Sequence, residues 1–339
     1  MKILLPVLAL LLSCHLATAA EVKYFDVPKG AHPHDVAPDP ERGGPVWYTA
    51  QRQGALGRLD PGTGTVEQIP LGEGSSPHGV IVGPDGAPWI TDSGLNAIVR
   101  VDPVSREVKR YPLPIAANAN LNTATFDRAG RLWFTGQAGY HGRLDPKTGK
   151  VEVWPSPRGR GPYGITTTAK GEVYYASLAG NHIARIDLAT GKATPIDPPT
   201  LRQGARRVWG DSMGRVWVSE WMSGQVSVYD PTLAASGKAW RAWKLPGAKP
   251  QAYSVWVDEN DKIWLTDFAA NAIVRFDPDR ETFESFPSTA PQAAVRQMLG
   301  RKGEAWGAES GADRLVVVRH GGRAPAAKDD VAVLVASAR

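Results

Sequence analysis

Residues 88–92, PWITD, are one copy of a short motif that recurs along the whole chain and predicts its fold. Alignment on the aromatic residue gives six further copies: VWYTA (46–50), LWFTG (132–136), VYYAS (173–177), VWVSE (216–220), IWLTD (263–267) and AWGAE (305–309). Successive aromatic residues are 42, 44, 41, 43, 47 and 42 residues apart. A period in the low forties is typical of a four-stranded propeller blade. The seven copies therefore predict an all-β fold, a seven-bladed β-propeller.

Each copy also has the local pattern of antiparallel sheet. A short apolar segment such as HGVIV (78–82) leads through a Gly/Asp turn into the aromatic segment, which is followed by a third segment ending in VRVD (99–102) and an outer segment, VKRYPL (108–113). Period-two strands joined by Gly, Asp and Asn turns indicate four antiparallel strands per blade. We expect the Asp residues of the LDP and VDP triplets to be turn formers and not ligands.

The two ends of the repeat predict how the ring closes. The seventh copy stops after DRLVVVRHGG (313–322) without an outer strand, whereas EVKYFDVP (21–28) is an outer strand that precedes the first copy. Pairing these segments would complete the seventh blade and remove an exposed sheet edge. We therefore expect a propeller domain at 21–322, followed by a tail at 323–339 that lies beyond the repeat.

Residues 1–20 have the pattern of a secretory signal peptide: Lys2, an apolar run and small residues before Ala20. Removal of this segment would leave a chain without cysteine, because Cys14 is the single one, so we expect a periplasmic or secreted protein without disulfides. LLSC (11–14) offers a minor alternative, in which Cys14 is a lipoprotein anchor. No other apolar stretch is long enough to span a membrane.

The composition excludes some functions. Hydrophobic residues make up 42% of the chain, enough for a substantial core, and the formal net charge of +5 is spread without a run of Lys or Arg. This distribution argues against nucleic-acid binding. We expect a monomer whose partner is a small molecule at the mouth of the central channel.

In a propeller, the turns that enter the innermost strands surround one mouth of the channel, so equivalent positions form a ring. In most copies the ring residue is the one eleven positions before the aromatic residue. The first copy has two extra residues, so its ring residue lies two positions earlier. In the seventh copy the ring residue could be Arg296, Val295 or Gln297, and we take Arg296. The predicted ring is His34, His78, Asn122, Tyr163, Arg206, Tyr253 and Arg296.

A second set of positions lies three residues after each aromatic and contains four carboxylates: Asp92, Glu220, Asp267 and Glu309. One reading is that all these polar side chains simply face a wet channel while the Trp residues pack between blades. The other is a functional site, because clustered imidazole, guanidinium and carboxylate groups suit proton transfer or a divalent cation.

The segments PHGVIVGPDGAPWITDSGLNAIVRVD (77–102), PYGITTTAKGEVYYASLAGNHIARID (162–187) and YPLP (111–114) resemble the virginiamycin B lyase (streptogramin B lyase) family. The resemblance extends to about Arg319. It implies a seven-bladed propeller that linearises cyclic depsipeptides by Mg²⁺-dependent elimination at an ester bond, with the metal polarising the substrate and a histidine acting as base.

The resemblance assigns Glu309 to a metal-ligand position. The chain departs from the family pattern at two other places: Tyr253 stands where the family has a substrate-contacting histidine, and AAVRQML (293–299) lacks the family's Glu-x-His pair. His34 and His78 in the first two blades form a comparable two-histidine arrangement displaced around the axis. Tyr163 or Tyr253 could act as acid or base if a neighbouring arginine lowers its pKa.

These observations lead to one preferred function and two alternatives. The preferred one is an exported carbon–oxygen lyase that opens a cyclic ester or lactone, with His34, His78, Tyr253 and Arg296 as catalytic residues. Substrate binding would involve Asn122, Tyr163, Arg206, Glu220 and Asp267. The alternatives are a binding propeller that holds an anion through Arg202, Arg206, Arg207 and Arg296, and a protein-interaction scaffold.

Overall fold

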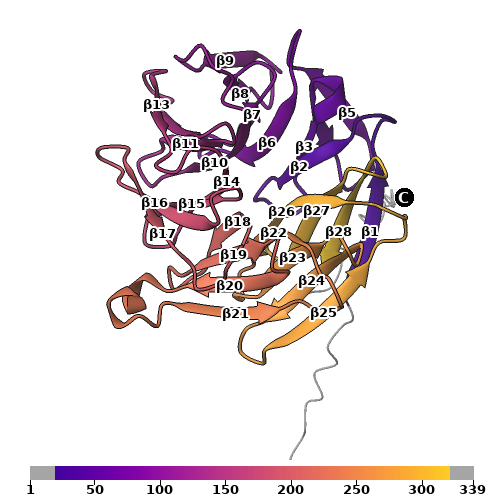
Figure 1. The fold of residues 1–339 in the computed structure, drawn as a ribbon. Coiled ribbons are helices and arrows are strands. Elements are labelled where there is room, and N and C mark those ends of the chain that lie inside the picture. Colours follow the sequence, from indigo (N-terminus) through magenta and orange to yellow (C-terminus); the bar gives the residue numbers. More distant parts are fainter. Residues whose placement is uncertain (1–19, 321–339) are drawn as a thin grey trace, which may run out of the picture.

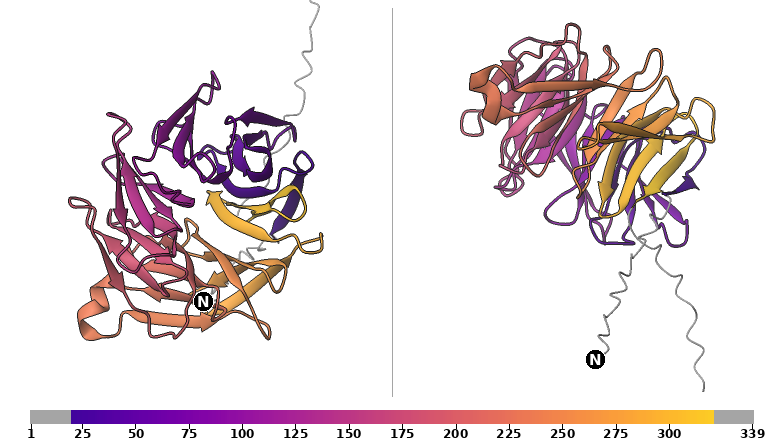
Figure 2. Two further views of the ribbon diagram at one scale, coloured as in Figure 1. Left: turned by 45° about the horizontal axis from the view of Figure 1, so that its top comes forward. Right: turned by 90° about the horizontal axis from the view of Figure 1, so that it is seen from below.

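A computed structural model of the chain describes residues 20–320 and shows seven four-stranded antiparallel sheets arranged in a ring (Figure 1). The innermost strands of the seven sheets gather around a common axis, and each blade packs its faces against its two neighbours. Figure 2 shows the same ring from two further directions. The predicted seven-bladed propeller is confirmed.

The strands follow one another from the axis outward in each blade. The first three blades are β2 (Pro33–Pro38), β3 (Val46–Ala50), β4 (Ala55–Leu59) and β5 (Val66–Pro70); β6 (Pro77–Val82), β7 (Pro88–Asp92), β8 (Ala97–Val101) and β9 (Val108–Pro112); and β10 (Leu121–Phe126), β11 (Leu132–Gly136), β12 (Tyr140–Leu144) and β13 (Val151–Pro155). The next three are β14 (Pro162–Thr167), β15 (Val173–Ser177), β16 (His182–Ile186) and β17 (Ala193–Ile196); β18 (Ala205–Gly210), β19 (Val216–Glu220), β20 (Gln225–Tyr229) and β21 (Trp240–Lys244); and β22 (Ala252–Val257), β23 (Ile263–Asp267), β24 (Ala272–Asp277) and β25 (Thr282–Pro287). Two short 3₁₀ helices, η1 (Gln51–Gln53) and η2 (Pro231–Ser236), lie in connections.

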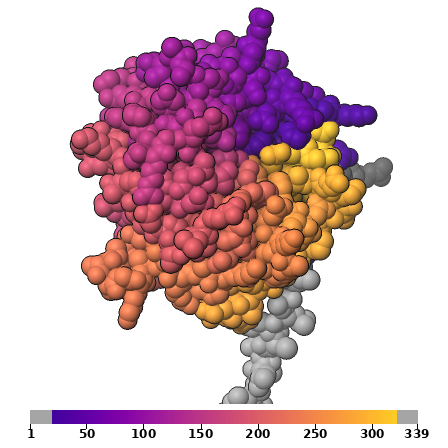
Figure 3. All heavy atoms as spheres, in the orientation of Figure 1, coloured from indigo at the N-terminus to yellow at the C-terminus, as the bar shows by residue number. Residues whose placement is uncertain are grey.

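The seventh blade is built from both ends of the described chain, as predicted. It contains β26 (Val295–Arg301), β27 (Glu304–Glu309), β28 (Arg314–Arg319) and, as its outer strand, β1 (Glu21–Asp26). β1 pairs antiparallel with β28 from Glu21 opposite Arg319 to Asp26 opposite Arg314. The first and last described segments consequently lie side by side on the surface (Figure 3). The ring is closed by backbone hydrogen bonds between residues nearly three hundred positions apart.

The repeated Trp has a hydrogen-bonding role as well as a packing role. Five of the motif Trp side chains donate their indole N–H to an acidic residue two to six positions earlier in the chain, at 2.8–3.0 Å. The pairs are Trp89–Asp85, Trp133–Asp127, Trp217–Asp211, Trp264–Asp258 and Trp306–Glu304. Each pair satisfies the polar atom of a large side chain whose rings fill the space between blades.

The hydroxyl residue two places after the motif aromatic joins neighbouring blades. Thr49 accepts a hydrogen bond from the Asp35 backbone N–H at 3.0 Å and donates to the His78 carbonyl of the next blade at 2.9 Å. Ser219 does the same between Arg207 and Tyr253, at 3.0 and 2.8 Å. Five of the seven motif copies have a hydroxyl residue at this position, whereas the fourth and seventh have Ala176 and Ala308. Where the hydroxyl is present, its bonds hold the start of the inner strand, and the motif thereby positions residues that face the channel mouth.

Three expectations concern residues outside the described range. The signal peptide at 1–20 (apart from Ala20), the lipid-anchor alternative at Cys14 and the tail at 323–339 stay predictions. None of the helices within residues 20–320 has the length and apolar character needed to cross a membrane.

The closure can be tested at Phe25 in β1. This side chain is 6% exposed and stacks on Trp306 with ring centroids 5.5 Å apart. We expect Phe25→Ala to lower the free energy of unfolding by about 3 kcal/mol, because it opens a cavity in a packed interface.

Val22, on the same strand but 37% exposed, provides the control. Denaturant unfolding of Val22→Ala should show a loss of about 0.5 kcal/mol or less. Equal losses for the two variants would contradict closure by β1.

Candidate functional site

The predicted first ring lies together at one end of the channel. In every blade the first inner-strand residue pairs with the last residue of the second strand, and the ring residue follows: Pro33 pairs with Ala50 before His34, and Val295 pairs with Glu309 before Arg296. This shared register selects Arg296 over its two neighbours for the seventh blade. The members in blade order are His34, His78, Asn122, Tyr163, Arg206, Tyr253 and Arg296.

A second layer of polar residues lies just below this ring; of its charged members, the sequence indicates Arg207 as an anion-binding candidate but gives no indication of Asp35. The pairing of every inner strand is interrupted after its first residue by a register shift. Such bulges re-aim side chains, so that two consecutive residues can enter the channel where strict alternation would send the second one away. Asp35 and Arg207 are the charged residues of this layer, and both are about 1% exposed.

Asp35 and Arg207 meet across the channel from the first and fifth blades. Arg207 Nη2 lies 3.3 Å from Asp35 Oδ1, and Arg207 Nη1 donates to the Thr123 hydroxyl of the third blade. Burial raises the pKa of the Asp35 carboxyl, while the Arg207 guanidinium opposes that rise. Arg207 thus links the first, third and fifth blades, and it neutralises Asp35, the one carboxylate in this layer.

The two histidines are in direct contact, with ring centroids 3.9 Å apart. His34 Nδ1 lies 2.8 Å from Asp35 Oδ1, and His78 Nδ1 lies 3.1 Å from the Asn122 carbonyl oxygen, which can only accept. Burial lowers the pKa of both imidazoles well below 6.5. They are therefore neutral at pH 7 and donate through Nδ1–H, which leaves Nε2 as the acceptor on each ring.

Tyr163 and Tyr253 form the other half of the site. Their hydroxyl oxygens are 2.9 Å apart, and Arg206 Nη2 donates to the Tyr163 oxygen at 3.0 Å. Because arginine can only donate, this geometry favours a chain in which Arg206 donates to Tyr163 and Tyr163 donates to Tyr253. The Tyr253 oxygen is then the terminal acceptor.

The charges around Tyr253 give it an unusual acidity. Burial alone would raise the pKa of Tyr253, but the guanidinium groups of Arg206, Arg207 and Arg296 outweigh burial and lower this pKa to about 8. Burial raises the pKa of the neighbouring Tyr163 to about 12. The two phenols thus have separate roles, Tyr163 as hydrogen-bond donor and Tyr253 as a group that ionises near neutral pH.

Arg296 stands out because nothing within residues 20–320 accepts a hydrogen bond from it. The side chain is half-buried, its Nε has no partner, and the guanidinium carbon is 5.9 Å from the centre of the Tyr253 ring. His32, also half-buried, is close enough to Arg296 for that charge to contribute, after burial and Arg52, to a lowered His32 pKa. Unpaired donors of this kind are uncommon and indicate a place for an anion or oxyanion.

The mouth side also holds a cavity of about 550 Å³ beside Trp221. Trp221 is shared between this cavity and the ring, because the Arg206 guanidinium lies 4.6 Å from its ring centre. Met222, Lys249, Pro250 and Gln251 contribute further lining. The space is adjacent to the charged ring and large enough for the body of a small ligand.

The four predicted carboxylates of the second set hold loops. Asp267 accepts hydrogen bonds from the Gln251, Ala269 and Ala270 N–H groups, and Glu220 accepts from Gln203 and Ser223. Asp92 likewise accepts from Ser75, Ser76, Gly94 and Leu95. These hydrogen bonds account for the acidic residue that recurs at this motif position, and no bound ligand is needed to explain it. We therefore do not include Glu220 or Asp267 in the proposed site.

The surroundings of Glu309 do not fit Mg²⁺. One oxygen of its carboxylate accepts two hydrogen bonds from Arg314, at 2.6 and 2.8 Å, and the other accepts from Ser288 at 2.7 Å. Both oxygens are thus occupied, whereas Mg²⁺ needs several free oxygen ligands. His34, Asp35 and His78 lie close enough for a metal, but Arg207 already neutralises Asp35, and Arg296 adds repulsion toward a cation.

Comparisons with known proteins agree with this architecture. A profile of the Virginiamycin B lyase family matches residues 13–240, more than half of the chain. The chain is similar to a streptogramin B lyase structure, with a TM-score of 0.80 and 21% identity over 89% of this chain and 98% of that one. A catalytically inactive virginiamycin B lyase variant from Staphylococcus aureus with quinupristin gives a TM-score of 0.80 and 19% identity, covering 89% and 99%. Identities this low show the shared fold alone.

A shorter similarity concerns a gluconolactonase from Zymomonas mobilis subsp. mobilis. It is 37% identical over 84 residues, which is 22% of this chain and 22% of that enzyme. The match therefore spans only about a fifth of the gluconolactonase.

The acidity of Tyr253 can be measured by ultraviolet titration of tyrosinate. We expect one phenol to ionise with a pKa of about 8 in the wild type and to disappear in Tyr253→Phe. Arg296→Met should raise this pKa, because it removes a positive charge that stabilises the phenolate.

The pH dependence of the free energy of unfolding provides a second test of the lowered Tyr253 pKa. The folded state loses the Tyr253 proton near pH 8, and the unfolded state keeps it to about pH 10, so the wild type should gain stability over Tyr253→Phe as pH rises through this window. Tyr140→Phe is the control, since Tyr140 is not near the site. A wild type without any early-ionising phenol would refute the assignment.

Proposed function

The chain belongs to the virginiamycin B lyase family, and we propose that it opens a cyclic ester or lactone by elimination at the charged mouth of its channel. The observation that carries this proposal is the unpaired Arg296 guanidinium beside Tyr253. The pair offers a donor for a developing oxyanion and an acceptor for a proton within one site.

Tyr253 is the proposed general base. A base works best when its pKa is near the working pH, and a pKa of about 8 meets this condition for a phenol. Tyr163 stabilises the phenolate by donating to it at 2.9 Å. The ring of Tyr253 lies between Phe268, with centroids 4.7 Å apart, and the Arg206 guanidinium, 3.8 Å from the ring centre, and these contacts fix its orientation.

Arg296 is the proposed oxyanion-binding residue, with Arg206 in support. Positive groups that are already in place where negative charge develops lower the barrier without reorganisation. In this chain the guanidinium groups would supply the positive charge, and no step is assigned to a metal at Glu309.

The proposed reaction conserves all atoms of the substrate. Tyr253 takes a proton from the carbon next to a carbonyl group, and negative charge develops on the carbonyl oxygen near Arg296. The electron pair then forms a carbon–carbon double bond while the bond from the neighbouring carbon to the ester oxygen breaks. The ester leaves as a carboxylate, and no water is consumed.

His34 and His78 would position the site from adjacent places in the same ring. Their neutral rings, fixed by Asp35 and Asn122, support the polar floor next to Tyr163, which lies edge-on to His78 with centroids 6.3 Å apart. The body of the substrate would lie against Trp221 and the adjoining cavity.

A second candidate is a propeller that holds an anion without transforming it. It is favoured by the excess of guanidinium over carboxylate groups at the mouth and by the complete burial of Tyr253. An exported protein, as the leader predicts, could bind a small carboxylate with the same residues.

The reaction can be tested with a streptogramin B and a panel of lactones, followed by mass spectrometry in heavy-oxygen water. Elimination gives a ring-opened product of unchanged mass with a new double bond, whereas hydrolysis adds labelled water. We expect Tyr253→Phe to lower the rate by about 10²–10⁴-fold and Arg296→Met by about 10²–10³-fold.

Arg241→Met, on the outer strand β21, should leave the rate unchanged, and a chelator should have no effect. Labelled product would exclude elimination and favour hydrolysis. Absence of turnover, combined with carboxylate binding that is lost in Arg296→Met, would support the anion-binding candidate.

A further inference from the structure

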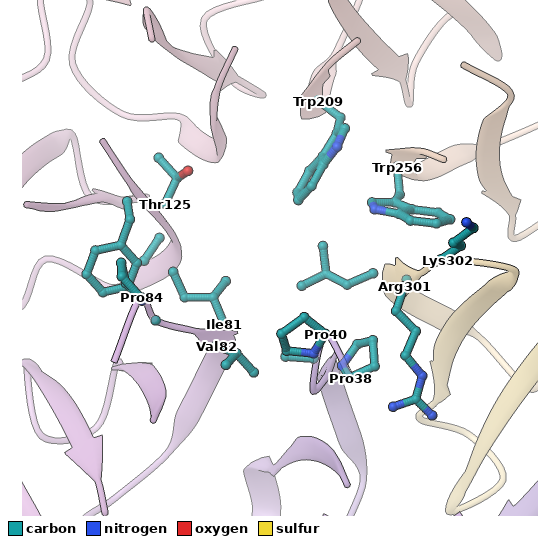
Figure 4. Close-up of a pocket in the computed structure, with 16 residues that line it drawn as sticks. Pro38, Pro40, Ile81, Val82, Pro84, Thr125, Trp209, Trp256, Arg301 and Lys302 are labelled. Atoms are coloured by element: carbon teal, nitrogen blue, oxygen red, sulfur yellow. The ribbon is translucent and has the colours of Figure 1, made fainter. Parts of the chain in front are cut away.

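The second end of the channel contains a cavity of about 480 Å³ that plays no part in the proposed reaction (Figure 4). Its lining comes from the last residues of the inner strands, such as Pro38 in β2, Val82 in β6 and Trp256 in β22. The ring at the mouth comes from the first residues of the same strands. The cavity therefore lies at the opposite end of the channel, about 13 Å away if the strands rise by 3.3 Å per residue.

Two indoles dominate one wall of this cavity. Trp209 and Trp256 project into the space from neighbouring blades and face Ile81, Val82 and Pro38 on the other side (Figure 4). Gly300 leaves room for Trp256, because a Cβ at this position would overlap the indole ring. The wall is thus suited to a flat apolar group, which both indoles can cover.

These two Trp residues differ in their hydrogen bonding from five of the six motif Trp residues and are similar to the sixth, Trp47, whose buried indole nitrogen also has no partner in the described chain. Five motif indoles donate to an acidic side chain, but no acceptor within the described chain is bonded to the indole N–H of Trp209 or Trp256. The Trp256 nitrogen is directed toward the open space in Figure 4. A ligand with an acceptor would satisfy donors that the protein leaves free.

The charges at the rim are positive. Arg301 turns its guanidinium away from the space and donates to the carbonyl groups of Asp39, Glu41 and Gly44 and to Glu304. Lys302 is exposed and has no ion-pair partner within residues 20–320. No acidic side chain lines the cavity. Within the described chain, Lys302 is therefore the charged lining residue that is free to bind a ligand, and it lies beside the apolar wall.

We propose that this cavity binds a small aromatic carboxylate. The ring system lies between the two indoles and the Ile81–Val82 wall, and the carboxylate accepts from Lys302 and the free indole N–H groups. The site is separate from Tyr253 and Arg296 and does not depend on the reaction proposed there.

The test uses calorimetric titration of the full chain with 2-naphthoate and with the neutral 2-naphthylmethanol. Trp256→Leu and Gly300→Ala should each weaken naphthoate binding about tenfold, the first by removing a stacking face and the second by displacing the indole. Lys302→Ala should weaken naphthoate and leave naphthylmethanol unchanged. Circular dichroism of each variant verifies folding, and Lys302→Ala, at an exposed position, keeps the test valid if Trp256→Leu or Gly300→Ala does not fold.

Trp221→Leu and Arg296→Met, at the other mouth, are the matched controls and should bind naphthoate like the wild type. Loss of binding in Arg296→Met with normal binding in Trp256→Leu and Gly300→Ala would move the ligand to the mouth and overturn the proposal. No measurable binding by the wild type would overturn it too. A chain ending at His320 should bind equally well, and a large gain in its affinity would instead assign the cavity to residues 321–339.

Discussion

The buried ion pair between Asp35 and Arg207 organises the channel of this propeller. The two residues are 172 positions apart and reach each other from the first and fifth blades. A buried ion pair costs desolvation energy and needs further hydrogen bonds to be tolerated. Here His34 and Thr123 provide them. The pair thereby fixes the tautomer of His34 and connects three blades below the mouth.

This pair also determines the charge of the site above it. Asp35 is the one channel carboxylate that shifts a histidine pKa, that of His78, and Arg207 already neutralises it. The charged groups that shift the pKa of Tyr253 are all guanidinium groups. Within residues 20–320, Arg206 and Arg296 have no carboxylate partner, and their positive charges lower the pKa of Tyr253. The mouth is an environment for anions, whereas the other end of the channel is lined by indole and aliphatic groups. The same inner strands thus present two chemically different ends.

The sequence predicted the blades, the closing strand and the seven ring positions, because each depends on a repeat that is visible along the chain. It did not predict Asp35 in the channel, since an irregular bulge and not the strand period directs that side chain inward. The acid of the W-x-x-D motif suggested ligands, but Asp267 and its equivalents hold loops through backbone N–H groups. Trp209 and Trp256 lie outside the repeated motif, and their place in the lining of the second cavity follows only from the structure.

The most direct test of this account is a double-mutant cycle on the unfolding free energy of Asp35→Asn, Arg207→Met and the double variant. If the two side chains meet across a closed ring, the single variants leave a buried polar partner unsatisfied, and the coupling energy should reach about 1–3 kcal/mol. Additivity within about 0.5 kcal/mol would show that they do not interact. That result would contradict the channel described here and the charge distribution that follows from it.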